Sequence, residues 1–262
     1  MEDANIRKTR GLSSEDARRI RQQGHDDAKE FALSIGLDTD YSNDIKAKKD
    51  VIDPSGDAHS VKSGEKKWQI FLYGIGRFGT DEAFTAMNGI GGLLIQCIES
   101  FPSTFEEYQQ DKNTAKQKLR IPMSELAEKM KEPYRLRAFL GKSMFNGGEV
   151  GYLTIKHDGK FHVFYYKEVI TLMSEKLEVC NSRAISSGQT PEQKVLLRFT
   201  GHNLGEIEMR NDSPAHYREI RFNMIKPVIM KFLFQFIPLR KKYNDSVYVY
   251  GEAAKRFGRW AI

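Results

Sequence analysis

Residues 46–73 read KAKKDVIDPSGDAHSVKSGEKKWQIFLY, and the rest of the chain is organised around this stretch. Residues 47–52 predict a short strand, and residues 58–63 predict a second one. The Pro-Ser-Gly-Asp sequence at 54–57 lies between them. It is a dense turn signal, because each of these residue types favours a turn conformation. The stretch therefore predicts a β-hairpin.

An acid, a hydroxyl and an amine are expected to meet on one face of this hairpin. Because strand side chains alternate between faces, Ser60 and Lys62 should point the same way while Val61 points into the core. Asp50 would lie across the hairpin from that face. Hydrolysis of a phosphodiester needs such a set, which offers an oxygen ligand for a divalent cation and a cation near the attacking water or the developing charge.

An aspartate, a hairpin and then a short x-x-Lys strand resemble the core of the PD-(D/E)XK nuclease superfamily, which is most familiar from type II restriction endonucleases. The resemblance covers about the first 75 residues. Lys49 precedes Asp50 where the family has proline, and Ser60 stands where the family usually has glutamate or aspartate. Gln69 and Tyr73 add support, because some branches of the superfamily carry Gln-x-x-x-Tyr just after the motif.

The resemblance implies a Mg²⁺ site and a set of catalytic side chains. A hydroxyl is a poor metal ligand, so a second carboxylate has to come from elsewhere. In the nuclease fold it often comes from the preceding helix, which makes Glu30 and Asp26 candidates, although either could be an ordinary solvated helix charge. The expected metal ligands are Asp50, the Val61 carbonyl, Asp57 and Glu30. The expected catalytic residues are Asp50, Ser60, Lys62, Gln69 and Glu30.

The resemblance also gives these residues roles in hydrolysis. Lys62 would orient or help to deprotonate the attacking water and would stabilise the charge of the pentavalent phosphorane. Ser60 would hold a metal-bound water, and Gln69 would contact the backbone next to the scissile phosphate. The alternative for Asp50 and Lys62 is a surface ion pair on a hairpin, which is common and energetically minor.

Composition indicates an ordinary soluble globular protein. The chain has 262 residues, of which 40% are hydrophobic and 29% charged, and its net charge of +6 is consistent with a polyanionic partner. No apolar run approaches the roughly 20 residues that span a bilayer, and the N-terminus has no apolar signal core. Cys97 and Cys180 are too few for a disulfide scaffold, so a reducing cytoplasm is the expected compartment.

The remaining pattern predicts an α/β fold, with a mixed central β-sheet flanked by helices. The resemblance implies a restriction-endonuclease-like core within it, with added strands and helices. Strands are expected at 151–155, 160–166, 194–200 and 206–210. Helices are expected at 13–21, 26–35, 81–100, 123–140 with a break near Pro133, 168–177, and 219–236 with a break near Pro227. We expect one nuclease domain over residues 1–262. Its catalytic core would occupy 13–100, and 145–262 would extend the sheet and recognise DNA.

Residues 74–79 read GIGRFG and match the G-x-G-x-x-G pattern of dinucleotide-binding loops. Such a loop would cradle a pyrophosphate at the start of a helix. The motif normally follows the first strand of a βαβ unit, however, and here no long strand with a terminal acid follows the next helix. We therefore expect the glycines to mark a turn between the core and the next helix.

A polar segment near residues 206–221 has the residue types that read bases and hold phosphates. The expected DNA-binding residues are Arg210, Asn211, Asp212, Ser213, Tyr217, Arg218 and Arg221. Asp212 or Ser213 would also make a good helix N-cap before Pro214. A rival interpretation places a metal on Glu206 and Glu208, which share a strand face, with His216 nearby.

These observations favour a Mg²⁺-dependent, sequence-specific double-strand DNA endonuclease of the type II restriction class. Double-strand cleavage usually needs two active sites, so a homodimer is expected. The resemblance also implies a cognate DNA methyltransferase that protects host DNA, as a functional rather than a physical partner. Three alternatives stay open: a non-catalytic DNA-binding protein, a repair or structure-specific nuclease, and a nucleotide-binding enzyme that uses residues 74–79.

Overall fold

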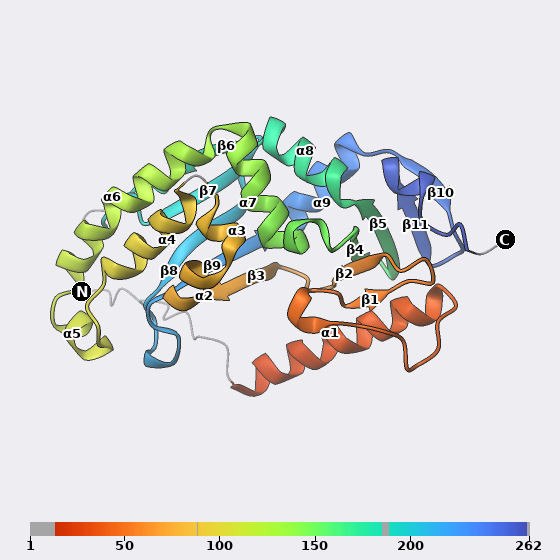
Figure 1. Ribbon diagram of the computed structural model, residues 1–262, viewed down its shortest axis with the longest axis horizontal. Helices are drawn as coiled ribbons and strands as arrows, with labels where there is room; N and C mark the ends of the chain where they lie inside the picture. The colour runs from red at the N-terminus through yellow and green to blue at the C-terminus, as the bar shows by residue number, and fades with distance from the viewer. Residues whose placement is uncertain (1–13, 88, 185–188, 261–262) are drawn as a thin grey trace, which may run out of the picture.

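The strands in the part of the chain that the structure describes form two β-sheets, which can be followed in Figure 1. The structure is a computed structural model that describes residues 14–87, 89–184 and 189–260. A six-stranded sheet with the order β1-β2-β4-β5-β11-β10 contains the predicted hairpin, and we call it the hairpin sheet. A five-stranded sheet has the order β3-β9-β8-β7-β6. The α/β class is therefore confirmed, but the strands do not all join one central sheet.

The hairpin sheet is mixed. Its parallel pairs are β2 with β4 and β5 with β11, and its other pairs are antiparallel. Its strands are β1 (Val51–Ile52), β2 (Ala58–Lys62), β4 (Tyr152–His157), β5 (Lys160–Tyr165), β10 (Leu239–Lys242) and β11 (Val247–Tyr250). The predicted β4–β5 hairpin is confirmed. Its turn residues Asp158 and Gly159 have φ values of 48° and 71°, the left-handed geometry that an Asp-Gly turn requires.

The five-stranded sheet is antiparallel throughout. Its strands are β3 (Lys67–Tyr73), β6 (Glu178–Asn181), β7 (Lys194–Phe199), β8 (His202–Arg210) and β9 (Glu219–Ile225). The strands predicted at 194–200 and 206–210 pair with each other, as expected. They then continue through β9 to β3 rather than extending the hairpin sheet, which corrects the prediction of a single sheet.

Helices cover the two sheets from different parts of the chain. Figure 1 shows α1 along the hairpin sheet, and α4, α6 and α7 over the five-stranded sheet. The helices are α1 (Ser14–Ser34), α2 (Ile75–Thr80), α3 (Glu82–Thr85), α4 (Ile90–Glu99), α5 (Phe105–Gln110), α6 (Lys112–Met130), α7 (Pro133–Phe145), α8 (Tyr166–Lys176) and α9 (Lys226–Phe236). The 3₁₀ turns are η1 (Ile45–Ala47), η2 (Asn146–Gly148), η3 (Pro214–His216) and η4 (Gly251–Lys255).

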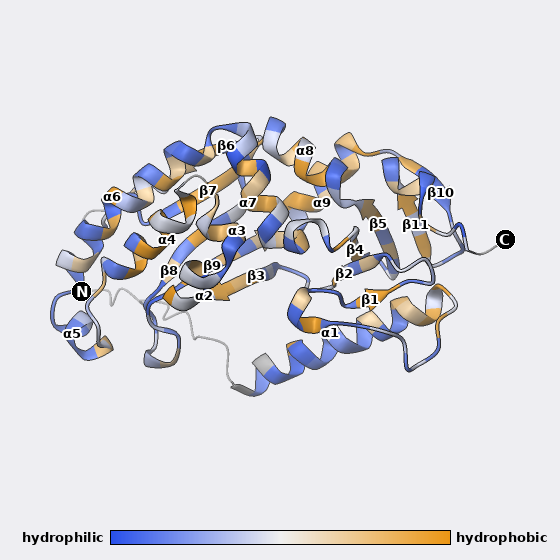
Figure 2. Ribbon diagram, in the orientation of Figure 1, coloured by the Kyte–Doolittle hydropathy of each residue, from blue (hydrophilic) through white to orange (hydrophobic). Residues whose placement is uncertain are grey.

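The second half of α1 is amphipathic and forms a core with the hairpin sheet. Its predicted apolar face is buried, with Ala28, Phe31, Ala32 and Ile35 packed against strand residues such as Val51. The first half of the helix is exposed and hydrophilic, as Figure 2 shows. The two helical segments predicted at 13–21 and 26–35 are therefore one continuous helix, and Ser13, the expected cap, lies outside the described residues.

The first predicted strand is shorter than expected. Asp44 accepts a hydrogen bond from the Ala47 backbone N–H at 3.2 Å and caps η1. Lys48 then has a left-handed φ of 61°, which interrupts an extended chain. Only the two residues of β1 are left to pair with β2 in the ladder, and Asp50 lies between the interruption at Lys48 and the start of β1.

The helix predicted over 219–236 is wrong in its first part. Residues 219–225 form β9, in which buried Ile220, Phe222 and Met224 alternate with the more polar Arg221 and Asn223. This period of two belongs to a strand. The helix α9 begins only at Lys226, so that Pro227 lies in its first turn, where the missing N–H leaves no hydrogen bond unmade.

The GIGRFG sequence does not form the predicted turn, and the strand before it, β3, pairs antiparallel with β9 rather than belonging to a βαβ unit. Residues 75–80 form α2 itself, and Gly74 is its N-terminal flanking residue with an ordinary φ of −85°. A Cβ atom added at Gly74, Gly76 or Gly79 would meet nothing within 4 Å. The motif therefore does not need glycine for its backbone geometry or for close approach.

Candidate active site

The predicted hairpin brings Asp50, Ser60 and Lys62 together at one point. Asp50 Oδ2 accepts hydrogen bonds from the Val61 backbone N–H at 2.8 Å and from Ser60 Oγ at 3.4 Å. Lys62 Nζ lies 3.6 Å from the same oxygen. The Asp50 and Lys62 side chains are 24% and 23% exposed, so solvent and a ligand can reach both.

Asp53 fixes the turn that places these groups. Its Oδ1 accepts hydrogen bonds from the backbone N–H groups of Ser55 at 2.9 Å and Asp57 at 3.0 Å. Its Oδ2 lies 3.3 Å from Nε2 of His59, whose Nδ1 lies 2.8 Å from Thr154 Oγ1. These buried groups connect the turn to β2 and to β4. The end of the hairpin that holds Asp50 and Lys62 is therefore connected to a buried polar network at its other end.

The short length of β1 leaves the backbone of Val61 open toward Asp50. The N–H and C=O of a strand residue point to the same side of the strand. The Val61 N–H is bound by the Asp50 carboxylate, and its carbonyl accepts a hydrogen bond from Lys62 Nζ at 3.3 Å. The side chain of Val61 packs on the α1 side, as predicted. The Asp50 carboxylate and the Val61 carbonyl thus lie on the same side of β2, where both could offer oxygen atoms to a cation.

A cavity of 180 Å³ lies beside this set, between the hairpin sheet, β3 and α7. Its walls are partly apolar, and its polar groups come from the hairpin and from the segment before it. The cavity is lined by Ile45, Lys48, Asp50, Ser60, Lys62, Ile70, Met144 and Leu153. Its volume suits a group such as one phosphate and its first waters, and a larger ligand would have to extend outside.

Lys48 is a cavity residue that the sequence analysis did not single out. Its Nζ donates hydrogen bonds to the Ile70 carbonyl at 2.9 Å and to the Ser143 carbonyl. Burial and the nearby Lys62 ammonium lower the pKa of Lys48 to about 7. The run Lys46, Lys48, Lys49 before Asp50 is the only sequence signal for this residue, and it does not tell which lysine is buried.

Glu30 and Asp57 are not brought to Asp50. His59 of β2 packs against Phe31 of α1, with ring centroids 4.9 Å apart, so α1 covers the face opposite to Ser60 and Lys62. On the α1 side, Glu30 Oε2 forms an ion pair with Lys156 Nζ at 2.7 Å. Asp57 Oδ2 accepts a hydrogen bond from the Tyr152 hydroxyl at 3.2 Å.

Gln69 lies outside the residues that line the cavity. It is in β3, paired with Asn223 of β9, and it is exposed. The cavity is instead lined by its neighbour Ile70. Tyr73 stacks on Phe71 with ring centroids 4.6 Å apart. The Gln-x-x-x-Tyr spacing therefore falls on a strand next to the site, without a side-chain contact to Asp50 or Lys62.

The oxygen ligands of the site fit a hydrated Mg²⁺ ion. Among the described residues, no three His, Cys, Asp or Glu side chains converge as a metal-binding group. Mg²⁺ is commonly held by only one or two carboxylates, and substrate phosphates and water complete its octahedron. Asp50 and the Val61 carbonyl match this mode, and Ser60 is placed to bond a metal-bound water.

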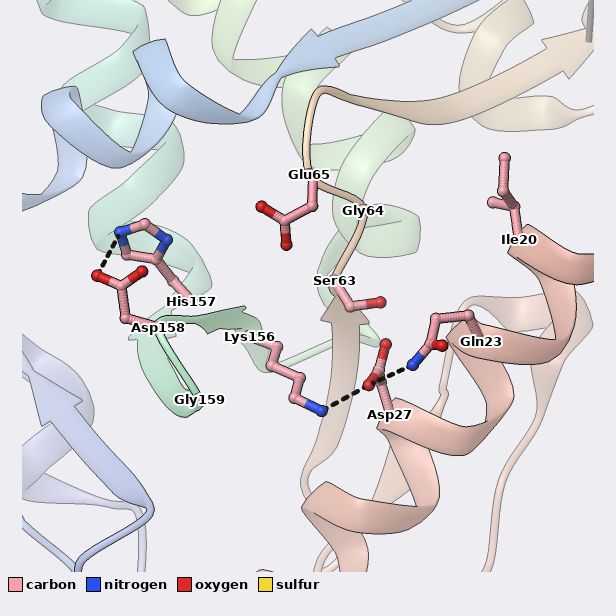
Figure 3. A pocket seen from close by; sticks show the side chains of 10 residues that line it. All are labelled: Ile20, Gln23, Asp27, Ser63, Gly64, Glu65, Lys156, His157, Asp158 and Gly159. Atoms are coloured by element: carbon pink, nitrogen blue, oxygen red, sulfur yellow. Dashed lines mark hydrogen bonds and ion pairs between the residues drawn. The ribbon is translucent and has the colours of Figure 1, made fainter.

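A second cavity, of 440 Å³, lies on the α1 side at the end of β2 and β4, and Figure 3 shows its lining. Lys156 Nζ and Gln23 Nε2 reach Asp27 Oδ1 from β4 and α1, at 2.7 Å and 3.1 Å. Burial raises the pKa of Asp27, but its hydrogen bonds outweigh this effect and hold the pKa below its usual value. The ion pair between Lys156 of β4 and Asp27 of α1 holds the helix against the sheet.

The residues predicted to bind DNA lie on the five-stranded sheet and mostly have intramolecular partners. Arg210 pairs with Asp212 at 2.6 Å, and Arg221 pairs with Glu208. The Tyr217 hydroxyl donates to the Pro102 carbonyl at 2.8 Å, and its ring packs among aromatic rings. Asn211, Ser213 and Arg218 lie in the same loop region, around the 3₁₀ turn η3. The helix expected after Pro214 is only this turn.

The rival metal site at Glu206 and Glu208 is occupied by basic side chains. Lys67 Nζ lies 2.5 Å from Glu206, and Lys194 bridges both glutamates. His216 pairs with Glu219 at 3.0 Å instead. Lys67 lies 139 positions from Glu206 in the sequence, and Lys194 lies 12 positions away, on the paired strand β7. This cluster stabilises the sheet by ion pairing.

Comparison of the chain with protein-family models, with curated proteins and with solved structures found no match. Within residues 14–87, 89–184 and 189–260, no helix is both long and apolar enough to cross a bilayer.

Proposed function

We propose that this protein is a Mg²⁺-dependent, sequence-specific double-strand DNA endonuclease of the type II restriction class. The observation that supports it most is the convergence of Asp50, the Val61 carbonyl and Lys62 around one cavity edge. A carboxylate and a carbonyl suit a hard cation, and an adjacent amine suits an attacking water or a phosphate oxygen.

The side chains of this site can divide the work of hydrolysis. Mg²⁺, when bound, would supply a Lewis acid for the phosphate. Lys62 Nζ can orient a water for attack on phosphorus, and its positive charge can stabilise the charge that develops on the phosphate oxygens. Ser60 Oγ can hold a further water by a hydrogen bond. The Asp50 hydrogen bond to Val61 keeps the carboxylate in place throughout.

The test is incubation of the purified protein with unmethylated phage DNA, in Mg²⁺ and in EDTA, beside the Lys62→Ala variant. Discrete fragments that require Mg²⁺ and disappear in the variant are expected. A smear would indicate a non-specific or repair nuclease. Intact DNA under all conditions, with salt-sensitive binding retained, would reject catalysis and indicate a DNA-binding protein.

The proposed activity carries further expectations about partners. A homodimer would place two sites on the two strands of a duplex. A cognate DNA methyltransferase would protect host DNA in the cytoplasm, where such an enzyme acts. The nucleotide-binding alternative has little support, since the strand before residues 74–79 lies in an antiparallel sheet and not in a βαβ unit. It would require dinucleotide binding in the absence of DNA.

A further inference from the structure

One row of directly paired residues crosses the hairpin sheet from Lys62 to Lys242. The pairs along this row are Lys62 with Ile155, Ile155 with His162, His162 with Tyr248, and Tyr248 with Lys242. Directly paired residues project from the same face of a sheet. Lys242 therefore projects from the same face as the candidate catalytic Lys62, at the opposite side of the sheet.

Both lysines also lie at the same end of the sheet. Lys62 is the last residue of β2, and Lys242 is the last residue of β10. The β4–β5 turn and the loop at 243–246 lie at this end too, because β4 runs parallel to β2 and β11 runs parallel to β5. The middle of the face is covered, since Phe234 of α9 packs on His162 with ring centroids 5.1 Å apart. A ligand that reaches both lysines must follow the end of the sheet.

A cluster of two amines and one aromatic ring lies at the far side, and we call it the basic–aromatic edge (Lys160, Lys242 and Tyr248). Lys160 Nζ lies 5.0 Å and Lys242 Nζ 5.3 Å from the centre of the Tyr248 ring. Lys160 Nζ also donates to the Asp245 carbonyl at 2.8 Å. All four residues of β10 are exposed. The ring and the loop thus hold two ammonium groups close together at the surface.

The C-terminal segment that contains this edge is basic. Residues 239–260 contain six Lys or Arg and two Asp or Glu, a net charge of +4 out of +6 for the whole chain. One of the two acids, Glu252, pairs with Lys255 at 2.7 Å. A positive surface of this kind attracts a polyanion and releases its counterions on binding.

We infer that the basic–aromatic edge binds the phosphate backbone of duplex DNA beside the site of cleavage. This inference rests on the proposed function. Four strand spacings of about 4.8 Å separate Lys62 from Lys242, or roughly 19 Å. Successive nucleotides of one strand rise by about 3.4 Å, so the edge would contact phosphates about five or six nucleotides from the scissile one.

Lysines on an edge strand also prevent pairing with a second sheet. That role accounts for Lys242 in β10, but not for Lys160, because β5 is an interior strand of the sheet. The two roles differ in what a substitution changes. Loss of a phosphate contact changes DNA affinity, whereas loss of edge protection changes self-association.

The test measures fluorescence anisotropy of a labelled duplex in EDTA, where Mg²⁺-dependent cleavage is prevented, at several salt concentrations. The variants are Lys160→Ala/Lys242→Ala, Lys62→Ala, and the control Lys112→Ala/Lys118→Ala, which removes two exposed lysines from α6. The edge variant should bind about 10-fold more weakly and lose about 1.8 from the slope of log K against log salt, since each phosphate contact contributes about 0.9. The control should change neither the affinity nor the slope.

Four other results would overturn the inference. An edge variant that binds with the affinity and slope of the unchanged protein would reject the surface, as would an edge variant that self-associates in sedimentation but binds normally. An equal loss in the control would show that only net charge matters. Absence of DNA binding by every form, the unchanged protein included, would reject the proposed function as well, so the two failures are distinguishable.

Discussion

Asp50 Oδ2 lies 2.8 Å from the backbone nitrogen of Val61. This hydrogen bond continues the contact between β1 and β2, with a side chain in place of a backbone carbonyl. The backbone ladder ends after the two residues of β1. The carboxylate takes the place of the next strand residue and faces a carbonyl and an amine from the same segment of β2. The end of a strand pair therefore becomes a small polar site without any further element.

Because Lys62 lies beside Asp50 in a partly exposed ion pair, its substitution should lower cleavage activity and leave the stability of the fold almost unchanged. Lys62→Ala should lower cleavage by at least about 100-fold, because positioned amines that act in proton transfer contribute 10² to 10⁴ in rate. The free energy of unfolding should change by less than about 1 kcal/mol, because the ion pair is partly exposed. Cleavage is measured on plasmid DNA, and stability by urea unfolding.

The matched control is Lys66→Ala, an exposed lysine in the segment that follows β2. It should retain normal cleavage and normal stability. If Lys62→Ala cleaves DNA at the normal rate, Lys62 is a structural ion-pair residue and the proposed chemistry is wrong.

The hairpin and its polar face were predictable because they depend on residues close together in the sequence. The turn at 54–57 and the alternation of Ser60, Val61 and Lys62 are local properties. The position of Glu30 is not local. Its helix periodicity identifies the apolar face of α1, but it does not tell which face of the sheet that helix covers.

Lys48 and β9 are two further features that local sequence patterns could not predict. Lys48 donates to carbonyls of Ile70 and Ser143, which are 22 and 95 positions away, and no local pattern identifies those partners. Residues 219–236 contain a strand followed directly by an apolar helix. Because β9 ends at Ile225 and α9 begins at Lys226, no loop residues mark the boundary between the two elements.

Lys48 should make the stability of the protein depend on pH in the alkaline range. Its pKa is about 7 in the folded state and about 10.4 in an unfolded chain. Between these values the unfolded state binds the proton and the folded state does not, so the free energy of unfolding should rise with pH. Lys48→Met should lack this rise. Urea unfolding at pH 7, 8 and 9 measures the difference between the two proteins.

Lys46→Met is the control, because Lys46 is an exposed lysine of the same turn. Its difference from the unchanged protein should be independent of pH. A constant difference for Lys48→Met as well would show that Lys48 is an ordinary charged lysine bound to the end of α7.

His59 should give a pH dependence of the same sign in the acid range. Its ring is fully buried between Phe31 and Tyr152, and this burial lowers its pKa despite Asp53. Below pH of about 6.5 the unfolded state takes up a proton that the folded state resists, so stability should fall. His59→Phe should show a smaller fall between pH 7.5 and 5.5. The urea midpoints of both proteins measure it, with the exposed His202→Phe as control.

Adjacent glycines in α4 should respond to alanine in opposite directions. A Cβ atom at Gly91 would lie 2.4 Å from the Phe84 carbonyl oxygen, whereas one at Gly92 would meet nothing within 4 Å. Gly91→Ala should therefore destabilise the fold by roughly 1–3 kcal/mol, because α4 must move away from α3. Gly92→Ala should stabilise it by about 0.5–1 kcal/mol, because alanine favours the helix. Urea unfolding of both variants measures the two changes in the free energy of unfolding. A stabilised Gly91→Ala variant would mean that α3 and α4 are not in close contact.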